Sequence, residues 1–201
     1  MNAVTEHYDA LIDENNDPFR DPKPLKTYME KWDGQKFIDC MQLDKRKTVL
    51  EIGVGTGRLA NRVASLCKLL YGIDLSHKTI GRASENLSAH NNIKLVCDDF
   101  MSVEFDDRFD VIYSSLTFMH IEDKFRAIQK VASLLKYGGL FVLSIDKNQS
   151  SYIDMGIRKV KIFPDNLEDI CFFLSETNLE LVGEFETENA YVTVSKKGSH
   201  A

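Results

Sequence analysis

From Thr48 onward, short apolar runs alternate regularly with amphipathic stretches. Short apolar runs are typical of buried strands, and apolar positions at three- and four-residue steps are typical of helices that cover a sheet. This alternation of strand and helix predicts an α/β domain with a parallel sheet. The predicted strands are 48–52, 69–74, 93–97, 111–113 and 140–145, and the predicted helices are 59–66, 76–89, 125–135 and 164–174.

The end of the chain departs from this alternation. Residues 179–186 and 191–194 have the composition of strands, and a link of hairpin length, 187–189, joins them. We therefore expect the parallel sheet to end in an antiparallel hairpin. Residues 146–163 are predicted to be a long connection.

The first 46 residues are polar, hold three of the four prolines and contain the single Trp. Helical periodicity appears at 5–12 and at 25–43, with a break at Asp33-Gly34. We expect residues 1–46 to form a helical segment ahead of a main domain at 47–201. Two roles are open for this segment, a lid over a site and a fixed cover on one face of the sheet. The aromatic side chains for a lid are Tyr8, Tyr28 and Trp32, and core packing is their alternative role.

The composition is that of an ordinary globular protein of 201 residues, with 43% hydrophobic and 28% charged residues. A net charge of −6 disfavours binding to nucleic acid by electrostatic attraction alone. The sequence shows no apolar run near the ~20 residues of a membrane span, and its acidic start has no signal-peptide pattern. We expect a cytoplasmic protein without a nucleic-acid or membrane partner, and the oligomeric state stays open.

The four cysteines are Cys40, Cys67, Cys97 and Cys171. They form no C-x-x-C pair, and no His stands at zinc-finger spacing from them. Each has apolar neighbours, which predicts buried free thiols rather than disulfides or a metal site.

The strongest chemical signal is the glycine-rich segment 51–60, Glu-Ile-Gly-Val-Gly-Thr-Gly-Arg-Leu-Ala, between a predicted strand and a predicted helix. Glycines let the backbone approach a ligand, and amides at a helix start suit a polar or anionic group. The dinucleotide fingerprint G-x-G-x-x-G would need its third glycine where Arg58 stands, whereas this chain has Gly57. Asp74 is the last residue of the second predicted strand. A carboxylate at this position can accept hydrogen bonds from the ribose hydroxyls of an adenosine-containing ligand.

These features together resemble the class I S-adenosylmethionine-dependent methyltransferases. The resemblance rests on E-x-G-x-G-x-G after strand one, an acid ending strand two, an acid after strand three and Phe-Asp opening strand four. It covers about 48–196 and implies a doubly wound, Rossmann-like α/β fold with a seven-stranded, mostly parallel sheet whose last strand is antiparallel. It also implies S-adenosylmethionine as cofactor and S-adenosylhomocysteine as product.

The resemblance further assigns residues to parts of the cofactor. It implies that Gly53, Gly55 and Gly57 line the methionine part and that Glu51 orders the loop near the cofactor's ammonium group. It implies that Asp74 accepts hydrogen bonds from the ribose hydroxyls. On the adenine side, it implies that Leu75 packs on the ring, that Asp99 (or, alternatively, Asp98) accepts a hydrogen bond from the adenine amino group and that Phe100 lies beside the ring. At the end of strand four, it implies that the backbone at Ser114 contacts the cofactor.

His120 is the candidate catalytic base, because the family places the loop after strand four beside the acceptor. Its alternative role is a helix-start histidine with a structural hydrogen bond. Enzymes that methylate the amino groups of nucleobases or of glutamine amides typically carry an Asn/Asp-Pro-Pro-Tyr/Phe motif after strand four. This chain has Ser114-Ser115-Leu116-Thr117 there, and it has no Pro-Cys pair to suggest cytosine methylation. We therefore expect in-line methyl transfer to a small-molecule acceptor, without a metal.

Two other function classes compete with this hypothesis. One is a non-catalytic module of the same fold that binds the cofactor or a nucleoside and regulates a protein partner. The other, a nicotinamide dehydrogenase, is disfavoured by the glycine spacing and by the little chain left for a substrate domain.

Overall fold

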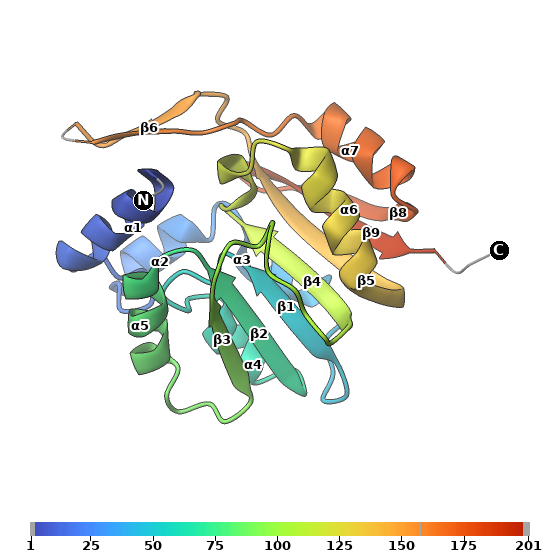
Figure 1. Ribbon diagram of the computed structural model, residues 1–201, viewed down its shortest axis with the longest axis horizontal. Coiled ribbons are helices and arrows are strands. Elements are labelled where there is room, and N and C mark those ends of the chain that lie inside the picture. Colours follow the sequence, from blue (N-terminus) through green and yellow to red (C-terminus); the bar gives the residue numbers. More distant parts are fainter. Residues whose placement is uncertain (1–2, 157, 199–201) are drawn as a thin grey trace.

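The computed structural model describes residues 3–156 and 158–198 and contains a seven-stranded sheet of order β3-β2-β1-β4-β5-β9-β8 (Figure 1). Strands β1 to β5 are parallel, and β9 runs antiparallel to both of its neighbours. The mostly parallel sheet with an antiparallel last strand is thus confirmed. The strands are β1 (Thr48–Ile52), β2 (Leu69–Asp74), β3 (Ile93–Cys97), β4 (Phe109–Ser115), β5 (Leu135–Asp146), β8 (Leu179–Glu186) and β9 (Ala190–Lys197).

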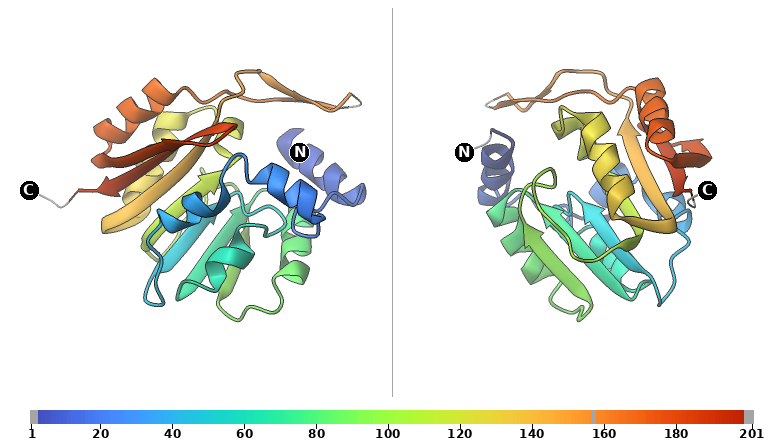
Figure 2. Two further views of the ribbon diagram at one scale, coloured as in Figure 1. Left: turned by 180° about the vertical axis from the view of Figure 1, so that it is seen from behind. Right: turned by 45° about the vertical axis from the view of Figure 1, so that its right-hand side comes forward.

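Helices cover both faces of the sheet. Helices α6 (Lys124–Leu134) and α7 (Leu167–Glu176) pack on the face seen in Figure 1. The opposite face, seen in the left panel of Figure 2, carries α3 (Gly34–Asp39), α4 (Ala60–Ala64) and α5 (His77–Asn86). Successive strand side chains point to opposite faces, so two separate apolar cores form, one on each side.

Residues 3–46 include α1 (Ala3–Asp13), α2 (Lys23–Met29) and α3. The helix predicted at 5–12 is confirmed with a slightly greater length. The helical segment predicted at 25–43 is divided into α2 and α3 at Asp33-Gly34, as expected. Gly34 has a φ of +72°, and its amide donates a hydrogen bond to the side chain of Asp33.

Several predicted boundaries differ from those of the structure, and the largest difference concerns the start of β5. Helix α6 ends at Leu134, and β5 begins directly after it instead of after Gly138-Gly139. Leu135 pairs with Phe109 and Leu140 pairs with Val111, so the glycines lie in an irregular part of the strand pairing.

The predicted long connection contains a two-stranded arm of β6 (Tyr152–Asp154) and β7 (Lys159–Lys161). The arm extends over α1 (Figure 1). The guanidinium group of Arg158 pairs with the carboxylate of Glu14. Strands of three residues are too short to show a recognisable alternation, so the sequence did not reveal them.

The cysteines of the described residues are free thiols, as predicted, but the prediction that all are buried was wrong. Cys67 is buried, whereas Cys97 ends the edge strand β3 and is exposed. In the ranges 3–156 and 158–198, no group of His, Cys, Asp and Glu has the arrangement of a metal site. No helix in the same ranges is long and apolar enough to cross a membrane.

Candidate functional site

A cavity of about 500 Å³ lies at the carboxyl ends of β1, β2 and β4. The strand order reverses between β1 and β4, and ligands of open α/β sheets bind at such a switch point. The volume lies within the usual range for small-molecule sites. The strand ends and the segments that follow them contribute to the wall Glu51, Gly53, Gly55, Thr56, Arg58, Asp74, Leu75, Asp98, Asp99, Phe100, Ser115, Thr117 and His120.

The glycine loop is held against the end of β2 by backbone hydrogen bonds. The amides of Gly53 and Val54 donate to the carbonyl of Ile73 at 2.9 and 3.0 Å. The carboxylate of Asp74 accepts from the amides of Gly55 and Ser76, both at 3.0 Å. Burial raises the pKa of Asp74, and these amide hydrogen bonds oppose the shift. Asp74 is therefore oriented by the loop that it borders.

Most of the residues named from the sequence line this cavity. Gly57 and Ser114 do not belong to the wall as the described residues form it. A Cβ atom on Gly57 would lie 2.8 Å from the side chain of Leu87, so this glycine permits close packing on α5. The buried hydroxyl of Ser114 donates to the carbonyl of Ile52 at 3.0 Å. Asp98 and Asp99 both line the cavity, so the choice between them stays open.

The ionisable side chains of Arg58 and Asp33 lie close enough to Glu51, on the cavity wall, to act on its pKa. Glu51 accepts a hydrogen bond from the hydroxyl of Tyr113 at 2.7 Å, and burial raises the pKa of Glu51 to about 8. Arg58 pairs with the buried carboxylate of Asp33 through contacts of 3.0 and 2.5 Å. A cationic group bound beside Glu51 would favour its ionised form. The sequence pointed to Arg58 only as a departure from the dinucleotide fingerprint.

Replacing Glu51 by Gln is expected to stabilise the ligand-free protein at pH 9 and to change its stability much less at pH 5. The folded-state pKa of Glu51 lies above its unfolded value, so its contribution to stability is lost as the pH rises from about 4.5 to about 8. Gln cannot ionise and escapes this loss. Thermal melts at both pH values measure the effect as a rise of a few degrees at pH 9. An equal shift at both pH values would contradict it.

Helix α1 contributes Val4, Thr5 and Tyr8 to the cavity wall. The hydroxyl of Tyr8 lies 2.8 Å from Nε2 of His120, which stands in the short 3-10 helix η1 (Phe118–His120). Burial lowers the pKa of His120 to about 4, helped by the nearby charges of His7 and Lys124. Burial also raises the pKa of Tyr8, so both side chains are neutral at pH 7.

The proton position on His120 follows from its surroundings. Its Nδ1 atom is buried and has no hydrogen-bond partner among the described residues. A buried N–H without an acceptor is rare and costly. This favours the tautomer with the proton on Nε2, donating to the oxygen of Tyr8. The hydroxyl hydrogen of Tyr8 is then available to a ligand.

The other aromatic side chains proposed for a lid lie elsewhere. Tyr28 and Trp32 pack edge to face, with ring centroids 5.4 Å apart, and Tyr28 is exposed. Neither contributes to the cavity wall in the part of the chain that the structure describes. The first 46 residues contribute Val4, Thr5, Tyr8, Pro18 and Met29 to that wall.

Residues 50–143 match the family model described as a methyltransferase domain. The match covers a little under half of the chain and agrees with its resemblance to the class I S-adenosylmethionine-dependent methyltransferases. The matched segment includes the glycine loop, Asp74 and His120, so most of the cavity wall lies within it.

The chain is similar to the ubiquinone biosynthesis O-methyltransferase of Coxiella burnetii, with 29% identity over 150 residues. The match covers 72% of this chain and 64% of the relative, so it spans less than two thirds of that protein's length.

Two solved structures share the fold of this chain. Magnesium protoporphyrin IX methyltransferase of Synechocystis PCC 6803, solved with bound S-adenosylmethionine, is 17% identical with a TM-score of 0.75, covering 97% of this chain and 95% of that one. The [4+2]-cyclase SpnF is 16% identical with a TM-score of 0.72, covering 100% and 98%. At such identities the likeness shows the fold alone, and the fold is not restricted to methyltransferases.

Proposed function

We propose that this protein is an S-adenosylmethionine-dependent methyltransferase that transfers the methyl group in line to a small-molecule acceptor. The observation that carries the proposal is the cavity at the carboxyl ends of β1 and β2, where the glycine loop and Asp74 share one wall. An acid at the end of β2 is placed to accept ribose hydroxyls. The name of the Coxiella burnetii relative supports testing oxygen acceptors first.

We assign the cofactor's parts to successive segments of this wall. Glu51, Gly53 and Gly55 would hold the methionine end, with the carboxylate of Glu51 toward its ammonium group. Asp74 would accept the ribose hydroxyls. We assign the adenine to Leu75, Asp99 and Phe100. Gly57 and Ser114 would support the loop and β1 from behind instead of contacting the cofactor.

The cofactor, when bound, would supply a methyl group attached to a sulfonium, whose thioether is a good leaving group. The protein then has to orient the acceptor and exclude water. With a pKa of about 4, His120 is a weak base. We therefore propose that His120 orients the hydroxyl of Tyr8, which donates a hydrogen bond to the acceptor.

The test of the function begins with calorimetric binding of S-adenosylmethionine and S-adenosylhomocysteine to the full chain. Saturating cofactor should also raise the melting temperature, because it binds the folded state selectively. Methyl release is then measured with phenols, carboxylic acids and amines as acceptors. Binding without transfer to any acceptor would favour a non-catalytic module, and binding of NAD alone would favour a dehydrogenase.

Replacing Tyr8 by Phe is expected to lower turnover about tenfold and to leave the dissociation constant of S-adenosylhomocysteine within about twofold of its original value. The change removes one hydrogen bond to the acceptor, worth about 0.5–1.5 kcal/mol, and keeps the ring. Steady-state kinetics with the best acceptor of the panel measures the effect. Unchanged kinetics would remove Tyr8 from the acceptor site.

We also propose a cytoplasmic location, supported by the ordinary globular composition. For residues 1–46 we propose the role of a lid. The support is the contribution of α1 to the cavity wall and the Tyr8–His120 contact.

A further inference from the structure

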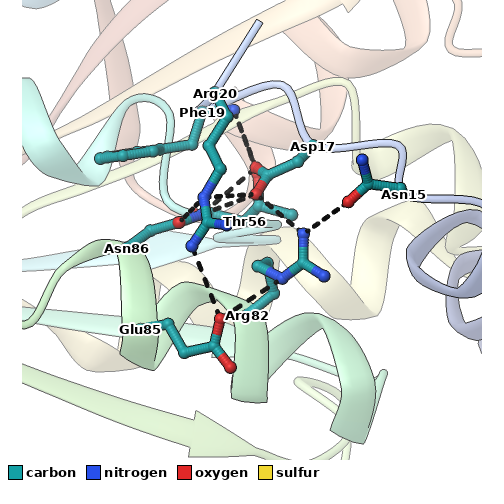
Figure 3. A network of polar contacts seen from close by, with 8 residues as sticks. All are labelled: Asn15, Asp17, Phe19, Arg20, Thr56, Arg82, Glu85 and Asn86. Carbon is teal, nitrogen blue, oxygen red and sulfur yellow. Dashed lines mark hydrogen bonds and ion pairs between the residues drawn. The ribbon is translucent and has the colours of Figure 1, made fainter.

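The segment that follows α1 is fastened to the protein by one buried carboxylate, that of Asp17 (Figure 3). It accepts hydrogen bonds from the amide of Phe19 at 3.1 Å, from Nδ2 of Asn86 at 3.1 and 3.2 Å and from Arg82 at 3.2 Å. Arg20 completes the set with an ion pair of 3.4 Å. Donors from the segment and from α5 converge on Asp17, so its position is fixed.

The same network reaches the glycine loop through Thr56. The side-chain amide of Asn86 that binds Asp17 also donates to the carbonyl of Thr56 at 3.0 Å. The amide of Phe19 donates to the hydroxyl oxygen of Thr56 at 3.3 Å, which joins the segment after α1 directly to the loop. Thr56 stands between two loop glycines and lines the cavity. Figure 3 shows these side chains gathered around Asp17.

A second, independent connection joins α1 to the other side of the loop. Ser76 donates its hydroxyl hydrogen to Asp9 of α1 at 2.5 Å. The amide of Ser76 donates to one oxygen of Asp74, and the amide of Gly55 donates to the other. Helix α1 and the segment that follows it therefore contact the loop and its supports at two places.

We propose that Asp17 and Asn86 are positioning residues that couple the docking of α1 to the conformation of the cofactor loop. The inference rests on the proposed function and adds an order of events. Cofactor binding fixes the loop, the loop fixes α1, and α1 then presents Tyr8 to the acceptor. Because coupling between two sites is reciprocal, a docked α1 must also strengthen cofactor binding.

Neither Asp17 nor Asn86 belongs to the cavity wall formed by the described residues. An effect of either residue on the cofactor must therefore be indirect, through Thr56 or through the placement of the segment that carries Pro18. Asp13 offers a matched control, because its exposed carboxylate joins the same helix α1 to Lys78 of α5 at 2.6 Å without reaching the loop.

The experiment compares the unaltered full chain with Asp17→Ala, Asn86→Ala and the control Asp13→Ala. Calorimetry gives the dissociation constant of S-adenosylhomocysteine, and hydrogen exchange of residues 3–20 is followed with and without it. We expect Asp17→Ala and Asn86→Ala to weaken binding about fivefold or more. Both should also lose the slowing of exchange that the ligand causes in the unaltered chain. Asp13→Ala should keep both properties.

A purely structural role for Asp17 and Asn86 would lower the melting temperature but leave the dissociation constant unchanged, and that result would overturn the coupling. If Asp17→Ala does not fold, Asn86→Ala decides, because it retains the Asp17–Arg82 ion pair. Absence of ligand binding to the unaltered chain would overturn the proposed function together with the coupling. Tight binding that is equal in all variants would overturn the coupling alone.

Discussion

Replacing Gly53 by Ala is expected to weaken S-adenosylhomocysteine binding more than a hundredfold and to lower the melting temperature. Gly53 has a φ of +79°, which is strained for a residue with a side chain. The added Cβ atom would lie 1.9 Å from the hydroxyl oxygen of Thr117 and 2.6 Å from its Cβ and Cγ2 atoms. Thr117 is β-branched and cannot turn all three atoms away. The loop must therefore leave the position in which it lines the cavity.

The control for Gly53 is Gly81→Ala in α5. A Cβ atom at Gly81 meets no atom within 4 Å, and alanine stabilises a helix interior relative to glycine by about 1 kcal/mol. Gly81→Ala should therefore keep its affinity and its melting temperature or raise the latter. Calorimetry and thermal melts on both variants give the comparison, and wild-type affinity in Gly53→Ala would refute the role given to the loop.

Replacing Asp74 by Ala is expected to weaken S-adenosylhomocysteine binding ten- to hundredfold while the fold is retained. The ribose would lose a charged acceptor, worth about 1.5–3 kcal/mol. The amides of Gly55 and Ser76 would also lose the partner that orients them. Asp74→Asn keeps a neutral acceptor and should give an intermediate affinity by calorimetry. An unchanged dissociation constant in Asp74→Ala would mean that Asp74 only shapes the turn.

Three strands could be predicted to the residue, and two of them, β1 and β2, are the continuous apolar runs typical of buried parallel strands. The bounds of β1, β2 and β3 agree with the predictions. Helix α5 begins after Ser76, whose hydroxyl accepts from the amide of Thr79 as an N-cap should. The glycine spacing and Asp74 pointed to the cavity because both are local to one strand–loop–helix unit.

The rest of the site depends on contacts between distant segments, which leave no periodic pattern in the sequence. Tyr8 and His120 stand 112 residues apart, and Asp17 and Asn86 stand 69 apart. Tyr8, Tyr28 and Trp32 were equal lid candidates by residue type, and only their packing separated Tyr8 from the others. Asp17 precedes Pro18 in a pattern typical of a turn. Its burial depends on hydrogen-bond donors from elsewhere in the chain, so the sequence did not reveal it.

Two parts of the cavity wall are encoded by separate stretches of the chain. The cofactor part comes from the segment at 50–143 that matches the methyltransferase family model, whereas Val4, Thr5 and Tyr8 come from a helix that precedes it. Under the proposed function, acceptor preference can therefore evolve by exchange of the first 20 or so residues while the cofactor machinery stays intact. A chimaera in which a relative's N-terminal segment replaces the first 20 or so residues should accept some of that relative's acceptors. Asp9 and Asp17 must be kept in it, because they join this segment to the rest of the chain.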